Sequence, residues 1–247
     1  MDQPGSERFT PAQTIFAWMV HALTASGTVL AFLALTAIVE ENWPLALLWL
    51  IVALAIDGID GSLARIAHVK IRIPRIDGET LDLIVDYLNY VFIPTVIIWR
   101  AGLVPPSLAA PLAGLILVSS LYNFTRRDLK TEDNYFRGFP ALWNVVAFYL
   151  FVTRPGETMA AAAIFLLAAL TFTSAPIIHP FRVRDFGRWP PILATLWAAA
   201  TAALLWPGWD QGLRGMILIL SLATAAALLA LSVVRLFRGS RTWPEQT

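Results

Sequence analysis

The sequence contains no cysteine and only three histidines in 247 residues. The lack of cysteine excludes disulfide bonds, thiolate nucleophiles and thiolate metal ligands. The scarcity of histidine also argues against a zinc site. Charged residues are scarce as well, at 14% of the chain, whereas apolar residues make up 57% and the mean hydropathy is +0.65. This balance is far from that of a soluble domain and indicates a membrane protein.

Apolar runs of about 20 residues, the length of helix that crosses ~30 Å of hydrocarbon, recur along the whole chain. They predict an all-α integral membrane protein with about eight transmembrane helices, of which the fifth is short. The expected spans are residues 13–39, 43–65, 80–99, 106–125, 140–153, 158–177, 190–206 and 213–236.

No repeat of fixed period, nucleic-acid-binding module or soluble second domain is visible between these runs. We therefore expect a single membrane domain over residues 1–247 and no nucleic-acid partner. A cleavable signal peptide is not expected, because the first apolar run is long and the polar residues before it lack a small-residue cleavage pattern.

The distribution of Lys and Arg predicts the orientation in the membrane. With eight spans, both termini lie on one side, together with the loops after the second, fourth and sixth spans. That side carries fifteen of the eighteen basic residues, so the positive-inside rule makes it cytoplasmic. The fifteen are Arg8, Arg65, Lys70, Arg72, Arg75, Arg126, Arg127, Lys130, Arg137, Arg182, Arg184, Arg188, Arg235, Arg238 and Arg241. Such a surface also suits anionic lipid headgroups.

Four carboxylates interrupt the second and third apolar runs: Asp57, Asp60, Asp82 and Asp86. A charge near the bilayer interior costs about 3 kcal/mol or more, so such acids normally face a cavity, a metal or a partner. Helical spacing places each pair on one stripe of its helix. A short basic loop joins the two helices, which therefore run antiparallel and can bring the four carboxylates together.

Four negative charges in one pocket repel one another unless cations neutralise them. Hard divalent cations such as Mg²⁺ or Mn²⁺ accept oxygen ligands and bind substrates through phosphate oxygens. Gly61 and Ala64 share the first stripe and leave room for a ligand, and Arg65 offers a planar fork for phosphate. The residues therefore indicate metal-assisted phosphoryl transfer. Two alternatives stay open: Asp–Arg pairs that only stabilise a helix bundle, and the vestibule of a cation-dependent transporter or channel.

The same residues carry a resemblance to a known family. The chain resembles the CDP-alcohol phosphotransferases, whose signature is Asp-x2-Asp-Gly-x2-Ala-Arg, a spacer, and Gly-x3-Asp-x3-Asp. Every fixed position is present: Asp57, Asp60, Gly61, Ala64, Arg65, Gly78, Asp82 and Asp86. The spacer of 12 residues, 66–77, is longer than in most members and is similar to that of the bacterial branch that makes phosphatidylcholine. Segments 21–27, 85–87, 130–136, 138–140, 143–144 and 179–180 also look like that branch.

This resemblance implies a fold and a reaction. The expected fold is a six-helix catalytic core over residues 13–185 with two additional C-terminal helices over 190–236. The resemblance also implies a bacterial inner-membrane location and a homodimer. The expected reaction joins choline to the phosphatidyl group of CDP-diacylglycerol and releases CMP, with Mn²⁺ or Mg²⁺ in a two-metal centre. A transferase similar to phosphatidylserine synthases, using another small alcohol, is the alternative within the enzyme class.

The resemblance also implies roles for individual residues. Asp57, Asp60, Asp82 and Asp86 are the expected metal ligands, and Asp86 is the expected general base for the attacking hydroxyl. The expected nucleotide and pyrophosphate residues are Thr24, Gly61, Ala64, Arg65 and Gly78.

Choline carries a quaternary ammonium that cannot donate a hydrogen bond, so proteins usually bind it with aromatic faces. The candidates for such a cage are Tyr87, Tyr90, Tyr135, Phe139 and Trp143. Glu79, Glu132 and Asp133 are weaker candidates for a countercharge. Arg126 and Arg127 are candidates for binding the lipid phosphate. The alternative for these aromatic and basic residues is the ordinary one at membrane interfaces, where Trp and Tyr act as anchors and Arg sets the topology.

Overall fold

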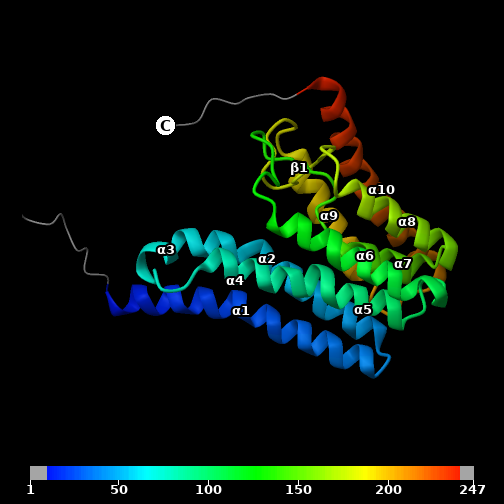
Figure 1. The fold of residues 1–247 in the computed structure, drawn as a ribbon, viewed down its shortest axis with the longest axis horizontal. Helices are drawn as coiled ribbons and strands as arrows, with labels where there is room; N and C mark the ends of the chain where they lie inside the picture. Colours follow the sequence, from blue (N-terminus) through cyan, green and yellow to red (C-terminus); the bar gives the residue numbers. More distant parts are fainter. Residues whose placement is uncertain (1–9, 240–247) are drawn as a thin grey trace, which may run out of the picture. The chain divides into compact units, whose positions relative to one another are not determined.

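The computed structural model of the protein describes residues 10–239, and these are almost entirely helical (Figure 1). The predictions of orientation and of signal-peptide absence partly depend on residues outside the described range. These residues are Arg8, Arg241 and the polar segment before the first span. The chain divides into two compact units, residues 1–94 and 95–247. The single domain predicted from the sequence stays a prediction.

Each of the eight apolar runs forms a helix, as predicted. The third run is one continuous helical segment made of α4 (Gly78–Asp86), η1 (Tyr87–Phe92) and α5 (Ile93–Arg100). The basic loop before it contains a short helix, α3 (Val69–Arg72). The other runs are α1 (Pro11–Val39), α2 (Trp43–Ile66), α6 (Pro106–Thr125), α7 (Trp143–Thr153), α8 (Glu157–Leu170), α9 (Trp189–Ala203) and α10 (Gln211–Arg238).

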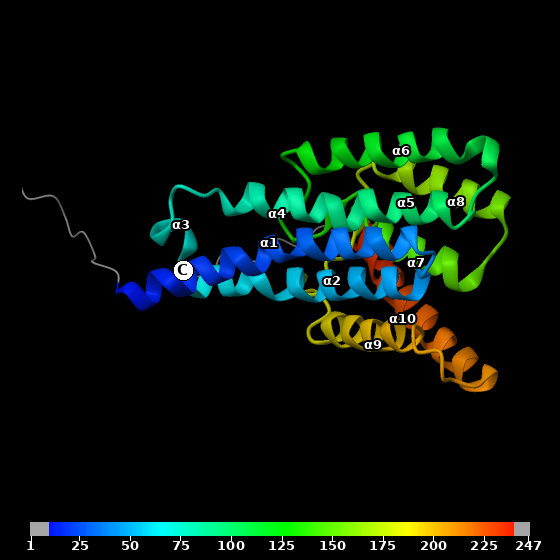
Figure 2. The same ribbon diagram turned by 90° about the horizontal axis from the view of Figure 1, so that it is seen from below.

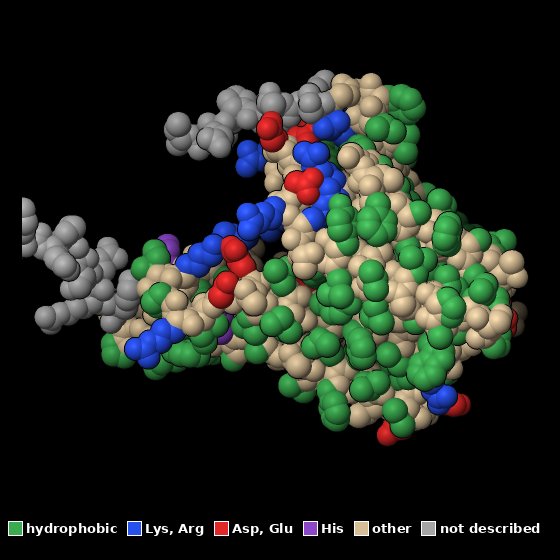
Figure 3. Space-filling model, viewed as in Figure 1, with side chains coloured by type: hydrophobic (Ala, Val, Ile, Leu, Met, Phe, Trp, Pro, Cys, Tyr) green, Lys and Arg blue, Asp and Glu red, His purple; other side chains and the backbone are tan. Residues whose placement is uncertain are grey.

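Within residues 10–239, five helices are long and apolar enough to cross a membrane: α1, α2, the segment from α4 to α5, α6 and α10. Large apolar side chains such as Phe32, Phe165 and Leu166 are exposed on the helices, and hydrophobic side chains cover much of the face seen in Figure 3. Exposed apolar surface of this extent is stable only in contact with lipid. The all-α, multi-pass membrane fold predicted from composition is confirmed.

Three apolar helices are shorter than the predicted spans. Helices α7, α8 and α9 contain 11, 14 and 15 residues, less than the roughly 20 that cross a bilayer. The sixth run was expected to reach residue 177, but its helix ends at Leu170. There Thr171 and Thr173 bond back to the carbonyls of Leu167 and Leu170. Pro176 follows, and the residue before a proline avoids the helical conformation.

In the first unit, α1 packs along both α2 and α4, and the three helices lie side by side in both views (Figures 1 and 2). Their starts follow from the local sequence. Asn42 accepts a hydrogen bond from the backbone of Leu45 at the start of α2, and Asp77 accepts from the backbones of Glu79 and Thr80 at the start of α4. Such caps satisfy the free N–H groups of a first helical turn. They set where the carboxylates of α2 and α4 fall along each helix.

The third run changes its helical pitch directly after Asp86. Residues Tyr87–Phe92 form a π-helical turn, and Ile93 donates its backbone N–H to the carbonyl of Leu88, five residues earlier. Pro94 explains the change, because proline has no N–H and its ring clashes with the carbonyl four residues before it. Wide turns of this kind occur frequently at functional sites.

In the second unit, two loops are held together by a short antiparallel pair, β1 (Phe136–Arg137) and β2 (Pro176–Ile177), with Phe136 opposite Ile177. The C-terminal end of α10, which is predicted to be cytoplasmic, makes hydrogen bonds to both loops. Arg235 donates to Asp133 at 2.6 Å, and the Ser232 hydroxyl accepts the backbone N–H of Ile178 at 2.9 Å. The last helix is therefore part of the packed structure of this unit.

Farther along the same unit, four polar side chains connect α7, α9 and α10. The Tyr149 and Ser221 hydroxyls lie 2.7 Å apart, Trp197 donates to the Tyr149 hydroxyl at 2.8 Å, and the Thr201 and Ser221 hydroxyls lie 3.0 Å apart. Helices in a membrane gain little from burying apolar surface against one another, so polar contacts of this kind help to hold them together.

Candidate functional site

The four carboxylates of α2 and α4 line one small cavity in the first unit. One carboxylate oxygen each of Asp57, Asp82 and Asp86 lies within 4.8 Å of the other two. All the possible metal-ligand atoms in this group are carboxylate oxygens, and oxygen is the ligand type that Mg²⁺ and Mn²⁺ prefer. The two helical stripes predicted from the sequence thus meet, and their acids form a cluster that could hold a divalent metal.

Asp60 lines the same cavity but has a protein partner. The Thr24 hydroxyl on α1 donates to Asp60 Oδ2 at 2.6 Å, and both side chains are buried. The sequence resemblance assigned Thr24 to the nucleotide; the structure places it beside an expected metal ligand. The roles of Thr24 and Asp60 stay predictions, and the contact shows that α1 contributes directly to the acid site.

Tyr90 and Asn89, from the π-helical turn, complete the cavity wall. The Tyr90 hydroxyl donates to Asp57 Oδ2 at 2.6 Å, and only 6% of Tyr90 is exposed. Asn89 donates through Nδ2 to the carbonyls of Gly27 and Val85, each at 3.0 Å. Asn89 was not among the predicted site residues, although it continues the helical stripe of Asp82 and Asp86.

Gly27 allows α1 to approach this wall. A Cβ atom on Gly27 would lie 2.4 Å from Val85 Cγ1, a separation that a real side chain does not show. Gly78, at the start of α4, is similarly close to His21: a Cβ there would lie 3.1 Å from His21 Cε1. Both glycines therefore set how closely α1 packs on α4.

The remaining signature residues lie on an open part of α2. A Cβ on Gly61 would meet only the end of the Arg65 side chain, at 3.8 Å. Arg65 is exposed and donates to the Ser62 hydroxyl at 2.9 Å, and Ala64 is half-buried. Gly61 and Arg65 are accessible to a ligand, as their predicted pyrophosphate role requires, and that role stays a prediction.

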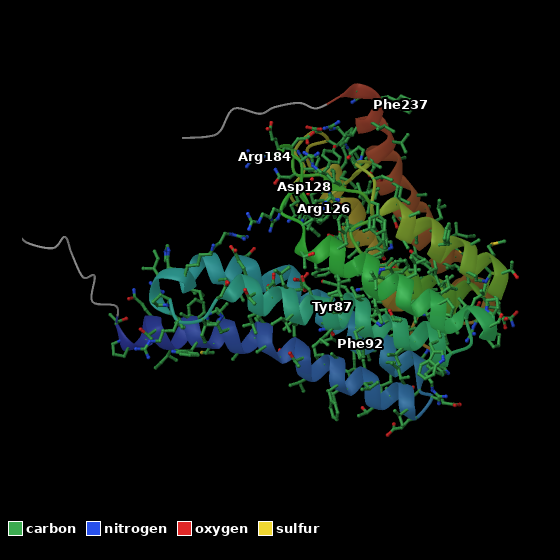
Figure 4. All side chains as sticks on the ribbon, in the orientation of Figure 1. Tyr87, Phe92, Arg126, Asp128, Arg184 and Phe237 are labelled. Carbon is green, nitrogen blue, oxygen red and sulfur yellow. The ribbon has the colours of Figure 1, made fainter. Side chains whose placement is uncertain are left out.

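The predicted choline residues fall in both units. Tyr87 and Tyr90 belong to the π-helical turn of the first unit, where Figure 4 labels Tyr87. Tyr135, Phe139 and Trp143 belong to the core of the second unit. Tyr135 and Trp143 are fully buried and donate to Asp185 and Ser120, at 3.2 and 2.8 Å. The rings of Phe139 and Trp143 meet edge to face at 5.0 Å. These contacts give the three residues a packing role, and their cage role stays a prediction.

Three of the five candidate charged residues have protein partners in the described structure. Arg126 follows α6 and makes two 2.9 Å hydrogen bonds to Asp128, and Figure 4 shows the pair in the second unit. These bonds lower the pKa of the Asp128 carboxyl. Arg127 is exposed. Among the proposed countercharges, Glu79 pairs with Lys70 at 2.6 Å and Asp133 with Arg235 at 2.6 Å, while Glu132 is exposed.

Comparison with known proteins assigns the family. The family model for CDP-alcohol phosphatidyltransferases matches residues 17–175. The chain belongs to this family. A CDP-alcohol phosphatidyltransferase is a transferase, so the chain is an enzyme rather than a transporter.

Curated relatives of this CDP-alcohol phosphatidyltransferase share one name. A phosphatidylcholine synthase from Pseudomonas aeruginosa is 42% identical over 240 residues, which is 97% of this chain and 99% of the relative. Phosphatidylcholine synthases from Mesorhizobium japonicum and Bradyrhizobium diazoefficiens are each 42% identical, over 76% and 79% of this chain and 70% and 73% of the relative. The first of these alignments includes the last two helices.

Proposed function

We propose that the protein acts as a phosphatidylcholine synthase, which transfers the phosphatidyl group of CDP-diacylglycerol to choline and releases CMP. The observation that carries this proposal is the 42% identity to a phosphatidylcholine synthase over 97% of the chain. The carboxylate cluster supports it, because phosphoryl transfer between two oxygens is a reaction that clustered carboxylates and divalent cations catalyse.

The residues of the cavity fit a divalent metal. Asp57, Asp82 and Asp86 converge within 4.8 Å, and Asp60 lines the same space. Mn²⁺ or Mg²⁺ held there would neutralise the carboxylates and polarise the pyrophosphate oxygens as the CMP leaving group departs. Tyr90 and Thr24 hold Asp57 and Asp60 in place through their hydroxyl groups. Metal ligands are usually oriented in this way by neighbouring hydrogen-bonding groups.

The protein groups then have separate tasks in the transfer step. Arg65 and the open backbone at Gly61 bind the pyrophosphate of CDP-diacylglycerol. The choline oxygen forms a bond to the phosphatidyl phosphorus, and the phosphoanhydride bond to CMP breaks. Asp86 receives the proton of the choline hydroxyl. Holding the two substrates in one orientation supplies a large part of the rate enhancement in such reactions.

The ammonium group of choline requires an aromatic or anionic surrounding. Tyr87 and Tyr90 support an acceptor site beside Asp86, because both lie on the turn that directly follows it. The Tyr135, Phe139 and Trp143 segment and the lipid-phosphate role of Arg126 and Arg127 remain part of the proposal. We also propose that the protein lies in the bacterial inner membrane with both termini in the cytoplasm, and that it forms a homodimer.

One assay tests the proposal. Purified protein is given CDP-diacylglycerol, Mn²⁺ and labelled choline, serine or inositol, and the lipids are then extracted. We expect label in phosphatidylcholine only, no product in excess EDTA, and a loss of turnover by orders of magnitude in Asp86→Asn. Label from serine rather than choline would assign a different acceptor. Substantial turnover in Asp86→Asn or in EDTA would refute the metal-assisted mechanism.

A further inference from the structure

The amide NH₂ group of Asn89 is hydrogen-bonded to the protein, whereas the amide oxygen is not bonded to any described residue. Its Nδ2 donates to the carbonyls of Gly27 and Val85, and Asn89 is 3% exposed. Two carbonyl acceptors require the NH₂ group to face them, so the position of the oxygen Oδ1 is determined. This oxygen is buried and has no hydrogen-bond partner among the described residues.

The surroundings of Asn89 make an unused oxygen unfavourable. Asn89 lines the same cavity as Asp57, Asp60, Asp82 and Asp86. Carboxylate and amide oxygens all accept hydrogen bonds, so they repel one another where no donor or cation lies between them. A buried acceptor without a partner is unfavourable, because it has lost its hydrogen bonds to water and gained none in return. The cavity is therefore built for an occupant that is positively charged.

The local backbone supports a functional position for this side chain. Asn89 lies within the π-helical turn Tyr87–Phe92, which directly follows Asp86. In the same turn, Tyr90 donates to Asp57. Gly27 leaves the space in which its own carbonyl reaches Asn89. The bonds to Gly27 and Val85 thus hold the Asn89 amide in a fixed orientation at the wall of the acid cavity.

We propose that Asn89 Oδ1 is a further ligand of the divalent cation bound by Asp57, Asp82 and Asp86. Amide oxygens are ordinary ligands for such cations, and a neutral ligand adds an oxygen without adding negative charge. This inference rests on the proposed metal centre and extends it to a residue outside the family signature. Sequence spacing places Asn89 on the stripe of Asp82 and Asp86, but its unused oxygen is visible only in the folded structure.

The test measures Mn²⁺ binding directly. Purified full-length protein is titrated with Mn²⁺ in the absence of substrates, and binding is monitored by electron paramagnetic resonance. Asn89→Leu removes both the oxygen and the two N–H bonds, and Asn89→Asp removes the N–H bonds but keeps an oxygen. We expect Asn89→Leu to weaken Mn²⁺ binding about ten- to hundredfold, the range seen when groups supporting a metal site are lost. Asn89→Asp should bind Mn²⁺ at least as tightly as the wild type.

Asn123→Leu is the matched control. Asn123 lies on α6, is 2% exposed, and its Oδ1 is also buried without a partner among the described residues, but it does not line the acid cavity. This variant should keep the wild-type Mn²⁺ affinity. Gel filtration in detergent and circular dichroism establish that each variant is folded before titration.

The outcomes separate the inference from the proposed function. Equal weakening in Asn89→Leu and Asn89→Asp would show that only the N–H bonds matter, and would overturn the ligand role, as would unchanged binding in Asn89→Leu. If Asn89→Leu does not fold, weaker binding in Asn89→Asp is sufficient to overturn it. Failure of the wild type itself to bind Mn²⁺ would refute the proposed metal centre as well.

Discussion

Two carboxylates of the acid site are each held by an uncharged hydroxyl. Thr24 donates to Asp60, and Tyr90 donates to Asp57, both at 2.6 Å. A hydroxyl fixes the direction of a carboxylate without neutralising it, so the charge stays available for a cation. A buried arginine in the same place would form an ion pair with the carboxylate and leave less negative charge for a cation. This choice of partners supports a catalytic cluster rather than a purely structural one.

Tyr90 has two candidate roles, as part of the choline site and as the hydrogen-bond partner of Asp57, and one substitution separates them. Tyr90→Phe keeps the aromatic ring for choline but removes the hydroxyl that holds Asp57. We expect the Mn²⁺ concentration for half-maximal activity to rise about tenfold, while the KM for choline changes little. Steady-state rates measured against each ligand in turn distinguish the two effects.

The control for Tyr90 is Tyr122→Phe, the same chemical change at an exposed tyrosine on α6 that does not line the cavity. It should leave the Mn²⁺ requirement unchanged. An increase in the KM for choline in Tyr90→Phe, with an unchanged Mn²⁺ requirement, would instead assign the hydroxyl to the acceptor site.

At the scale of elements, the contact between α1 and α4 depends on Gly27. Gly27→Ala places a methyl group 2.4 Å from Val85 Cγ1, closer than two carbon atoms can approach without a shift. We expect a destabilisation of about 1–3 kcal/mol and weaker activity, since overpacking moves α1 away from the acid site. Val85→Ala removes the contacting methyl groups, so the double variant Gly27→Ala with Val85→Ala should recover part of the loss. Thermal unfolding in detergent measures both effects.

Gly114→Ala on α6 is the control for this clash. A Cβ at Gly114 would meet nothing within 4 Å. The substitution should therefore be neutral, or stabilising by up to about 1 kcal/mol through helix propensity. If Gly27→Ala were also neutral or stabilising, the structure would tolerate a Cβ at position 27, and Gly27 would not limit how closely α1 packs on α4.

The loop that contains His179 should make stability depend on pH. Burial, together with the charges of Lys130 and Arg182, lowers the pKa of His179 to about 4. Its ring stacks on Phe136, with centroids 5.2 Å apart. In the unfolded chain the pKa is close to 6.5, so below that pH the unfolded state binds a proton that the folded state does not. The free energy of unfolding should therefore decrease as the pH falls from about 6.5 towards about 4, by up to about 3 kcal/mol.

His179→Phe tests this dependence, because it keeps an aromatic ring for the stack and removes the titrating group. Thermal unfolding of both proteins is compared between about pH 7 and about pH 4.5. The variant should lose less stability on acidification than the wild type. Identical pH profiles would mean that His179 becomes protonated without cost in the folded protein.

At the scale of the whole molecule, the orientation in the membrane is the main prediction. Reporters fused at the N-terminus, after Thr247, and in the loops near Arg72 and Arg184 should report the cytoplasm. A reporter near Gly208 should report the opposite side, because the basic residues lie overwhelmingly in the first set of loops. Reporters that place the two termini on opposite sides would show that the number of spans is odd.

The lengths of α7, α8 and α9 make this topology experiment informative. They contain 11, 14 and 15 residues, and each is too short to cross ~30 Å of hydrocarbon as a helix by itself. Polar bonds from Tyr149 and Ser221 nevertheless connect α7 and α9 to the long α10. A reporter next to Arg154, between α7 and α8, should report the side opposite the termini if the two short helices cross as a pair.

The sequence by itself determined the class of fold, the helical runs and the four acids. Long apolar runs are sufficient to predict membrane helices, because a backbone in lipid must satisfy its own hydrogen bonds. Spacing within one helix is sufficient to place Asp57 with Asp60 and Asp82 with Asp86, since the helical repeat is constant. The ends of helices were less predictable: the sixth run stops at Leu170 because threonine side chains and Pro176 end it locally.

Only the tertiary structure decided which side chains from different helices meet. The bonds from Thr24 to Asp60 and from Tyr90 to Asp57 join residues 36 and 33 positions apart. They depend on how closely Gly27 lets α1 approach and on the wide turn before Pro94, neither of which has a periodic signal in the sequence. The same holds for the buried positions of Tyr135 and Trp143, because aromatic residues near membrane surfaces look alike in sequence whether they face a ligand, the lipid or the protein core.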